Sequence, residues 1–118
     1  MPNQIPTRDF TIIAGNSGTV DNPDGIVIVL KADGSPEDLT GSTIVFRAKN
    51  GSTEVLRKDS TDGITVDAEA GRITIPITAA ESRALPPASR YEVERRIGSA
   101  QRTRLSGRLI VIGGVNDD

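Results

Sequence analysis

Residues 62–87 limit the possible folds more than any other stretch of the chain. Apolar and polar residues alternate in 63–66 and again in 72–77, which is the period of half-buried β-strands. Between the two runs, Gly71 ends a segment of turn-forming residues and tolerates the positive φ that hairpin turns use. The stretch therefore predicts two short strands joined by a tight turn.

A short helix is predicted immediately after this hairpin. Thr78 and Glu81 have the spacing of a capping box, in which each side chain satisfies a free N–H of the first helical turn. Pro86-Pro87 follow closely and cannot continue a helix. We therefore expect a single helix over about residues 79–85.

The rest of the chain predicts further short strands separated by segments rich in glycine, proline and aspartate. With the two already described they give about eight strands at spacings typical of an all-β sandwich. The additional strands are expected over residues 10–14, 25–31, 42–48, 53–57, 90–97 and 101–112.

Two of the connections carry specific predictions. Asn50-Gly51 is a strong signal for a type I′ hairpin turn, because both residues tolerate positive φ. Residues 98–100 are expected to form a three-residue loop in the last hairpin, with Tyr91, Val93 and Ile97 facing inward. The resulting register would place four pairs opposite each other: Tyr91 and Gly107, Val93 and Leu105, Glu94 and Arg104, and Arg95 and Thr103.

The chain is expected to contain one domain. Residues 1–8 include two prolines and little apolar material, so we interpret them as an N-terminal arm. Residues 9–115 would form the sandwich, and 116–118 an acidic tail. A length of 118 residues is enough to bury a single core without staples.

The composition excludes several kinds of chemistry. The sequence has no cysteine and no histidine, so disulfides, thiolate nucleophiles, zinc–thiolate sites and imidazole general bases are impossible. Aromatic residues make up only 3% of the chain, which counts against base-stacking surfaces for nucleic acid. No signal peptide is expected, and the apolar runs are too short for the ~20 residues of a membrane-spanning helix. We expect a soluble protein.

The order of short motifs resembles a group of small tailed-phage and prophage proteins, whose relatives include the N-terminal domain of the baseplate upper protein of siphophages. The resemblance runs from about residue 7 to residue 115. It is carried by Asp38-Leu-Thr-Gly41, Gly63-Ile64, Gly71-Arg-Ile73, Thr78-Ala-Ala-Glu81 with Leu85-Pro86, Tyr91-Glu-Val-Glu94 and Ser106-Gly-Arg108.

This resemblance implies an immunoglobulin-like antiparallel β-sandwich that serves as a building block of a virion. It implies a non-enzymatic role in the tail, baseplate or fibre attachment, contacts with copies of the chain and with other virion proteins, and assembly in the host cytoplasm. The sequence has no long region after residue 115 for a receptor-binding tip. A capsid decoration or head–tail connector role is therefore an alternative.

An arginine-rich last hairpin is the first candidate site. Its arginines could bind an acidic partner or phosphate, or they could pair with carboxylates across the strands. With Glu94 opposite Arg104, paired or solvated strand surface is the simpler interpretation, and a subunit contact is the functional one. The arginines in question are Arg95, Arg96, Arg102, Arg104 and Arg108.

Two strands are apolar at consecutive positions, whereas a sandwich strand needs apolar residues on one face only. Residues 26–30 and 109–112 form these runs. Either another element or a neighbouring subunit should cover the second face. We therefore predict contacts with a partner at Val27, Val29, Ile110 and Ile112.

The remaining candidates are weaker. The 15–25 loop is long and could serve a carbohydrate-binding or adhesion module, although sugars usually stack on aromatic rings. The acidic segments 21–25 and 59–63 lack the alternating oxygen ligands of a calcium loop and are explained by turns. Asp67 with Glu69 would lie in an exposed turn, where nothing raises a carboxyl pKa for acid catalysis. No catalytic residue, cofactor, metal or small-molecule substrate is expected.

Overall fold

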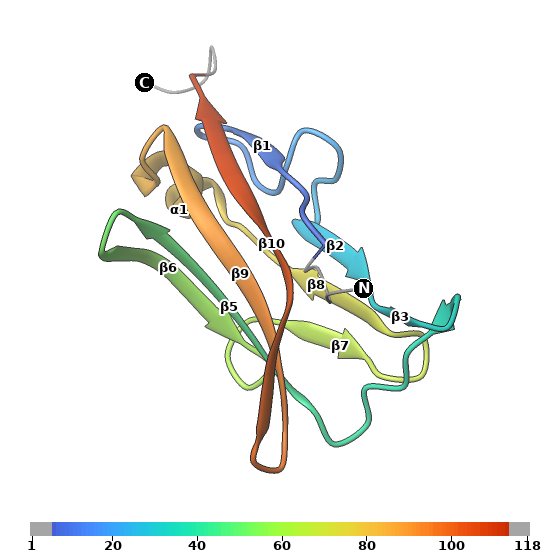
Figure 1. The fold of residues 1–118 in the computed structure, drawn as a ribbon. Helices are drawn as coiled ribbons and strands as arrows, with labels where there is room; N and C mark the ends of the chain where they lie inside the picture. Colours follow the sequence, from blue (N-terminus) through green and yellow to red (C-terminus); the bar gives the residue numbers. More distant parts are fainter. Residues whose placement is uncertain (1–5, 114–118) are drawn as a thin grey trace.

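The structure is a computed structural model of the chain, and it describes residues 6–113. The described residues form ten strands and one helix (Figure 1). The strands are β1 (Phe10–Ile13), β2 (Ile26–Val29), β3 (Lys31–Ala32), β4 (Ser35–Pro36), β5 (Thr43–Asn50), β6 (Thr53–Asp59), β7 (Thr65–Asp67), β8 (Arg72–Ile75), β9 (Ala88–Ile97) and β10 (Ala100–Ile112); the helix is α1 (Ala79–Ala84). No helix among these residues is long and apolar enough to cross a membrane.

The strands form two main sheets that pack as layers (Figure 1). One sheet has the order β1-β10-β9-β5-β6, and the other has the order β2-β8-β7. This division of strands is that of an immunoglobulin-like β-sandwich, which confirms the predicted fold class. One pair departs from the expected antiparallel pattern, because β1 runs parallel to β10.

The core lies between the two sheets and is built mainly from aliphatic side chains, as the composition requires. The three aromatic residues gather in it: the Phe46 ring stacks on Tyr91 with ring centroids 5.6 Å apart, and the Phe10 and Tyr91 ring centroids are 5.8 Å apart. All three rings are buried. All three aromatic side chains therefore pack in the core, and none of them forms an exposed ring surface.

The hairpin, turn and helix predicted within residues 62–87 are present, although β7 begins at Thr65 rather than at residue 63. Ile73, Ile75 and Ile77 are buried on one face, and Gly71 has φ +64° in the turn. The capping box of α1 is present: the Thr78 hydroxyl accepts from the Glu81 amide at 3.0 Å, and the Glu81 carboxylate accepts from the Thr78 amide at 2.9 Å.

Lys58 of β6 joins the capping box to the five-stranded sheet. Its ammonium group lies 2.8 Å from a carboxylate oxygen of Glu81 and also donates to the Pro76 carbonyl. The pKa of the Glu81 carboxyl is lowered: partial burial raises it, but the hydrogen bonds from Lys58 and from the Thr78 amide outweigh that effect.

The two predicted hairpins are present, but their turns are not where the sequence indicated. Asn50 remains in β5 and pairs with Thr53, so the loop is Gly51-Ser52. In the last hairpin Ile97 pairs with Ala100, which leaves a two-residue loop instead of three. Ile97 is exposed rather than inward-facing, because the β9–β10 hairpin extends beyond the rest of the sandwich (Figure 1).

A β-bulge in β10 then restores part of the expected register. The bulge lies between Thr103 and Leu105, so Leu105 still pairs with Val93, and Gly107 with Tyr91. The pairs nearer the loop are different: Thr103 lies opposite Glu94, and Arg102 lies opposite Arg95. The predicted pairs Glu94 with Arg104 and Arg95 with Thr103 are therefore wrong.

Residues 6–8, which we expected to be part of an arm, run beside β10. The Arg8 amide donates to the Ser106 carbonyl at 2.9 Å, and the Tyr91 hydroxyl donates to the Arg8 carbonyl. This close approach needs Gly107, since a Cβ there would lie 1.9 Å from the Arg8 carbonyl oxygen. The rest of the predicted arm, residues 1–5, and the acidic tail 116–118 lie outside the described residues.

Candidate functional site

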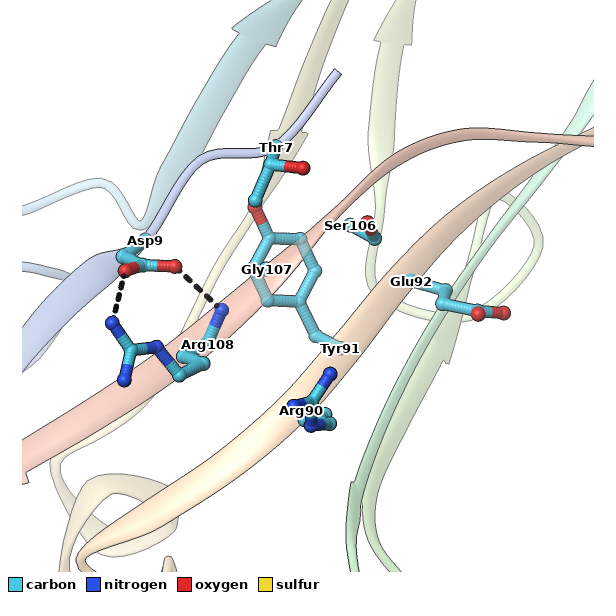
Figure 2. A pocket seen from close by; sticks show the side chains of 8 residues that line it. All are labelled: Thr7, Asp9, Arg90, Tyr91, Glu92, Ser106, Gly107 and Arg108. Atoms are coloured by element: carbon cyan, nitrogen blue, oxygen red, sulfur yellow. Dashed lines mark hydrogen bonds and ion pairs between the residues drawn. The ribbon is translucent and has the colours of Figure 1, made fainter. Parts of the chain in front are cut away.

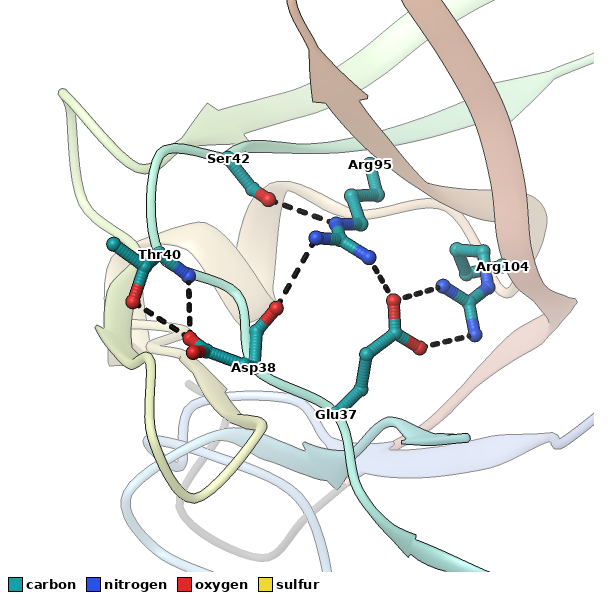
Figure 3. A network of polar contacts seen from close by, with 6 residues as sticks. All are labelled: Glu37, Asp38, Thr40, Ser42, Arg95 and Arg104. Carbon is teal, nitrogen blue, oxygen red and sulfur yellow. Dashed lines mark hydrogen bonds and ion pairs between the residues drawn. The ribbon is translucent and has the colours of Figure 1, made fainter. Parts of the chain in front are cut away.

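The structure separates the arginines of the last hairpin instead of gathering them into one site. Arg95 and Arg104 both bind Glu37, which follows β4 (Figure 3). Arg104 is bidentate, with distances of 2.8 and 2.7 Å to the two carboxylate oxygens. Arg95 also donates to the Ser42 hydroxyl at 2.7 Å and to the Asp38 carbonyl at 3.2 Å. We call Glu37, Arg95, Arg104 and Ser42 the Glu37 network.

This network has the character of a structural contact. The Glu37 side chain is only 11% exposed and accepts hydrogen bonds from both guanidinium groups. Bidentate arginine–carboxylate pairs are among the stronger polar contacts in proteins. Because Glu37 lies on the segment between β4 and β5, whereas Arg95 and Arg104 lie on β9 and β10, the network joins the last hairpin to that segment (Figure 3).

The bulge explains why sequence reasoning missed this arrangement. It inserts Arg104 as an extra residue in β10, so Arg104 loses the position opposite Glu94. Glu94 instead pairs with Arg96 on its own strand. Glu37, 67 residues before Arg104, takes the place of the predicted cross-strand partner, and no local pattern in the sequence points to it.

The other two arginines have different surroundings. Arg108 binds Asp9, which accepts from the Arg108 amide and guanidinium at 3.0 Å each. The pKa of Asp9 is lowered by these contacts, chiefly by the hydrogen bond from the Arg108 amide. Arg102 is exposed near the hairpin tip and forms no ion pair within residues 6–113.

A second group of cations lies on the outer face of the five-stranded sheet, and only Arg108 among them was a candidate from the sequence. Arg90 of β9 is directly opposite Lys49 of β5 and directly opposite Arg108 of β10. All three side chains are exposed. We call Lys49, Arg90 and Arg108 the cationic row. Like charges in directly opposed positions destabilise a sheet, so the fold itself does not account for this row.

Shallow pockets adjoin the cationic row. One of about 340 Å³ is lined by Arg90 and Arg108 together with Asp9, Glu92 and Ser106 (Figure 2). Another of about 310 Å³ is lined by all three cations and by Ser89. Ser89 is 5% exposed, and its hydroxyl has no hydrogen-bond partner among the described residues.

Tyr91 also lines the first pocket, although its ring belongs to the core (Figure 2). Burial raises the pKa of its hydroxyl well above the usual value. The hydroxyl remains protonated at physiological pH and donates to the Arg8 carbonyl. Its role is to hold residues 6–8 against the sheet.

The predicted partner-contact valines and isoleucines lie on two different surfaces. Ile110 and Ile112 project from the outer face of β10, where Ile112 pairs with Ile13 of β1. Val27 and Val29 project from the outer face of β2 in the other sheet. Val29 is 41% exposed and Ile112 is 47% exposed. No element of the described residues covers Val29 or Ile112, and cover by a neighbouring subunit stays a prediction.

The 15–25 loop is held in place by backbone contacts and carries a small pocket. The Gly18 amide donates to the Ile77 carbonyl at 2.8 Å, and the Val20 amide to the Thr11 carbonyl at 2.9 Å. A pocket of about 250 Å³ lies between Ile13 and the loop, where it is lined by Asn16, Ser17, Thr19, Val20 and Pro23.

The acidic turns behave as local structure. Asp59 accepts from the Thr61 hydroxyl and amide, and these bonds lower its pKa. In the other turn Asn22, not an aspartate, caps the Asp24 amide. Within residues 6–113 no cluster of three carboxylates is placed to hold a metal ion. Asp67 and Glu69 are both exposed beside the 67–71 turn.

Comparison with known proteins gives a fold likeness and no family. No family model matches the chain, and no curated protein matches it. Among solved structures, the chain is similar to the NK cell receptor NKp44, described as a triggering partner in natural cytotoxicity, with a TM-score of 0.49 and 14% sequence identity. The likeness covers 95% of this chain and 100% of the receptor chain.

Proposed function

We propose that this chain is a non-enzymatic structural protein of a tailed-phage particle, acting in the tail, baseplate or fibre attachment through contacts with copies of itself and with other virion proteins. The phage assignment is supported by the sequence resemblance of its short motifs. The contact role is supported by apolar side chains that the described chain leaves exposed on strand faces.

The outer face of β1 and β10 carries this proposal. Ile13 and Ile112 are direct neighbours, and Ile110 lies on the same face two residues before Ile112. We call these three isoleucines the β1–β10 apolar patch. Apolar residues at neighbouring positions on a solvent face add nothing to the core and lower the free energy of the protein only when another surface covers them.

The test measures self-association and binding to other particle proteins. Light scattering of the purified chain should show concentration-dependent oligomers, and Ile112→Glu should weaken them by placing a charge in the contact. Val29→Glu tests the β2 face separately, and Thr65→Glu, at an exposed position of the same sheet, is the matched control. A chain that stays monomeric and binds no particle protein contradicts the proposal.

The position in the particle is decided by a second measurement. Electron microscopy of particles that carry a tagged copy of the chain should place it in the tail, baseplate or fibre-attachment region. Density on the capsid or at the head–tail junction would favour the capsid decoration or connector alternative.

A carbohydrate-binding or adhesion module is a second candidate function, favoured by the pocket beside the 15–25 loop. Asn16, Ser17 and Thr19 supply amide and hydroxyl groups there, next to apolar Val20. The pocket has no aromatic ring on which a sugar could stack. Glycan binding that is lost when residues 16–24 are shortened, with folding retained, would support this alternative.

A further inference from the structure

We propose that the cationic row is a binding site for a short acidic peptide segment of a partner protein. This inference rests on the proposed contact function and names a partner chemistry for it. It starts from the positions of Lys49, Arg90 and Arg108, which lie directly opposite one another on three adjacent strands.

The charge on this row is only partly balanced within the described chain. Asp9 lies at one end and binds Arg108, whereas Lys49 and Arg90 form no ion pair with any residue of 6–113. The next positions toward the hairpin tip are mixed, since Glu92 lies opposite Arg47 on one side and Ser106 on the other. The excess of positive charge is therefore confined to the row and its pockets.

Ser89 also lines the pocket bordered by Lys49, Arg90 and Arg108, but its side chain belongs to the opposite face of the sheet. It lies directly opposite Leu109 and two residues before Tyr91, and both of these side chains are in the core. The unpaired Ser89 hydroxyl is therefore not a ligand group of the row, and the inference rests on the charges and their spacing.

The spacing of the cations suits a peptide. Neighbouring strands lie about 4.8 Å apart, so the row extends about 10 Å across the sheet. An extended peptide rises about 3.3 Å per residue, and three to four residues span that distance. A segment with two or three carboxylates among four residues would therefore place a negative charge near Lys49 and near Arg90, since Arg108 is already paired with Asp9.

Other polyanions fit less well. Nucleic acids and most saccharides bind to exposed aromatic rings, and Phe10, Phe46 and Tyr91 are all buried.

The test uses synthetic peptides and the full chain. A labelled peptide containing Asp-Glu-Asp-Glu should bind in a fluorescence anisotropy titration at low salt, and the same peptide with Asn and Gln in place of the acids should not. Arg90→Ala should weaken binding by roughly threefold to fivefold, which is the size expected for one exposed charge pair. Added salt should weaken it further.

Arg102→Ala is the matched control, because Arg102 is exposed, unpaired within the described residues and remote from the row on the hairpin. Equal weakening by Arg102→Ala, no binding of the acidic peptide, or tighter binding of single-stranded DNA or a sulfated oligosaccharide would each overturn the inference. The oligomerisation assay with Ile112→Glu is run in parallel. Oligomers without peptide binding overturn this inference and leave the proposed function standing.

Discussion

The Glu37 network and the cationic row both contain arginines of β9 and β10, but the surroundings of these arginines differ. Arg95 and Arg104 share a carboxylate that is mostly buried, whereas Arg90 faces two other cations in the open. Arginines of the first kind stabilise the fold, because removing a partner leaves a partly buried charge. Arginines of the second kind contribute nothing to the fold and are available to a ligand.

The largest effect is expected at the centre of the Glu37 network. Glu37→Ala should lower the free energy of unfolding by about 2 to 3 kcal/mol, because two guanidinium groups lose charge-assisted hydrogen bonds and the remaining exposure screens part of the loss. Urea denaturation measures this. The control Glu69→Ala, in an exposed turn, should change stability by less than about 0.5 kcal/mol. Equal effects at both positions would remove the distinction between the two regions.

A smaller effect is expected at Arg104, where one substitution changes the contact geometry and keeps the positive charge. Arg104→Lys retains the positive charge but cannot form the bidentate contact with both Glu37 oxygens. We expect a loss of about 1 kcal/mol in the free energy of unfolding, intermediate between the wild type and Glu37→Ala. If the lysine variant is as stable as the wild type, the network acts through charge alone.

Acid should weaken ion pairs in which a carboxylate is held by a cation, such as the pair of Glu81 with Lys58. The pKa of Glu81 is lowered in the folded chain, so the unfolded chain binds its proton first as the pH falls below the ordinary value of 4.5. The stability from this carboxylate is thus present above that value and is lost as the pH falls through the lowered folded pKa.

Glu81→Gln tests whether the Glu81 carboxylate loses its contribution to stability as the pH falls. At neutral pH the variant should be less stable by about 0.5 to 1 kcal/mol, and the difference from the wild type should shrink at about pH 3. Urea midpoints at several pH values measure it. Some acid sensitivity should remain, because the pKa values of Asp9, Asp38 and Asp59 are lowered as well. A difference that grows in acid would contradict the assignment.

The smallest effect is expected in the cationic row. Arg90→Gln should leave stability unchanged or raise it by a few tenths of a kcal/mol, because it relieves the repulsion from two opposed cations. Any gain should shrink in high salt, which screens exposed charges. Thermal unfolding at low and high salt measures both. A loss above about 1 kcal/mol would show that Arg90 belongs with the structural arginines.

The sequence by itself determined the local structure. Alternation placed Ile73, Ile75 and Ile77 on one buried face, and the spacing of Thr78 and Glu81 located the helix, because both signals depend on neighbours a few residues apart. The same reasoning placed Val93 opposite Leu105, but only because a shorter turn and a bulge shifted the register by opposite amounts.

Only the tertiary structure decided which charged residues meet. The bulge at Arg104 exchanged Glu94 for Glu37 as its partner, and the pairing of β9 with both β5 and β10 brought Lys49 and Arg108 to either side of Arg90. These contacts join residues far apart in the chain, and their energies depend on strand order and burial. Local sequence patterns specify neither the strand order nor the burial of a charged side chain. The fold class could therefore be predicted from the sequence, while the candidate site could not.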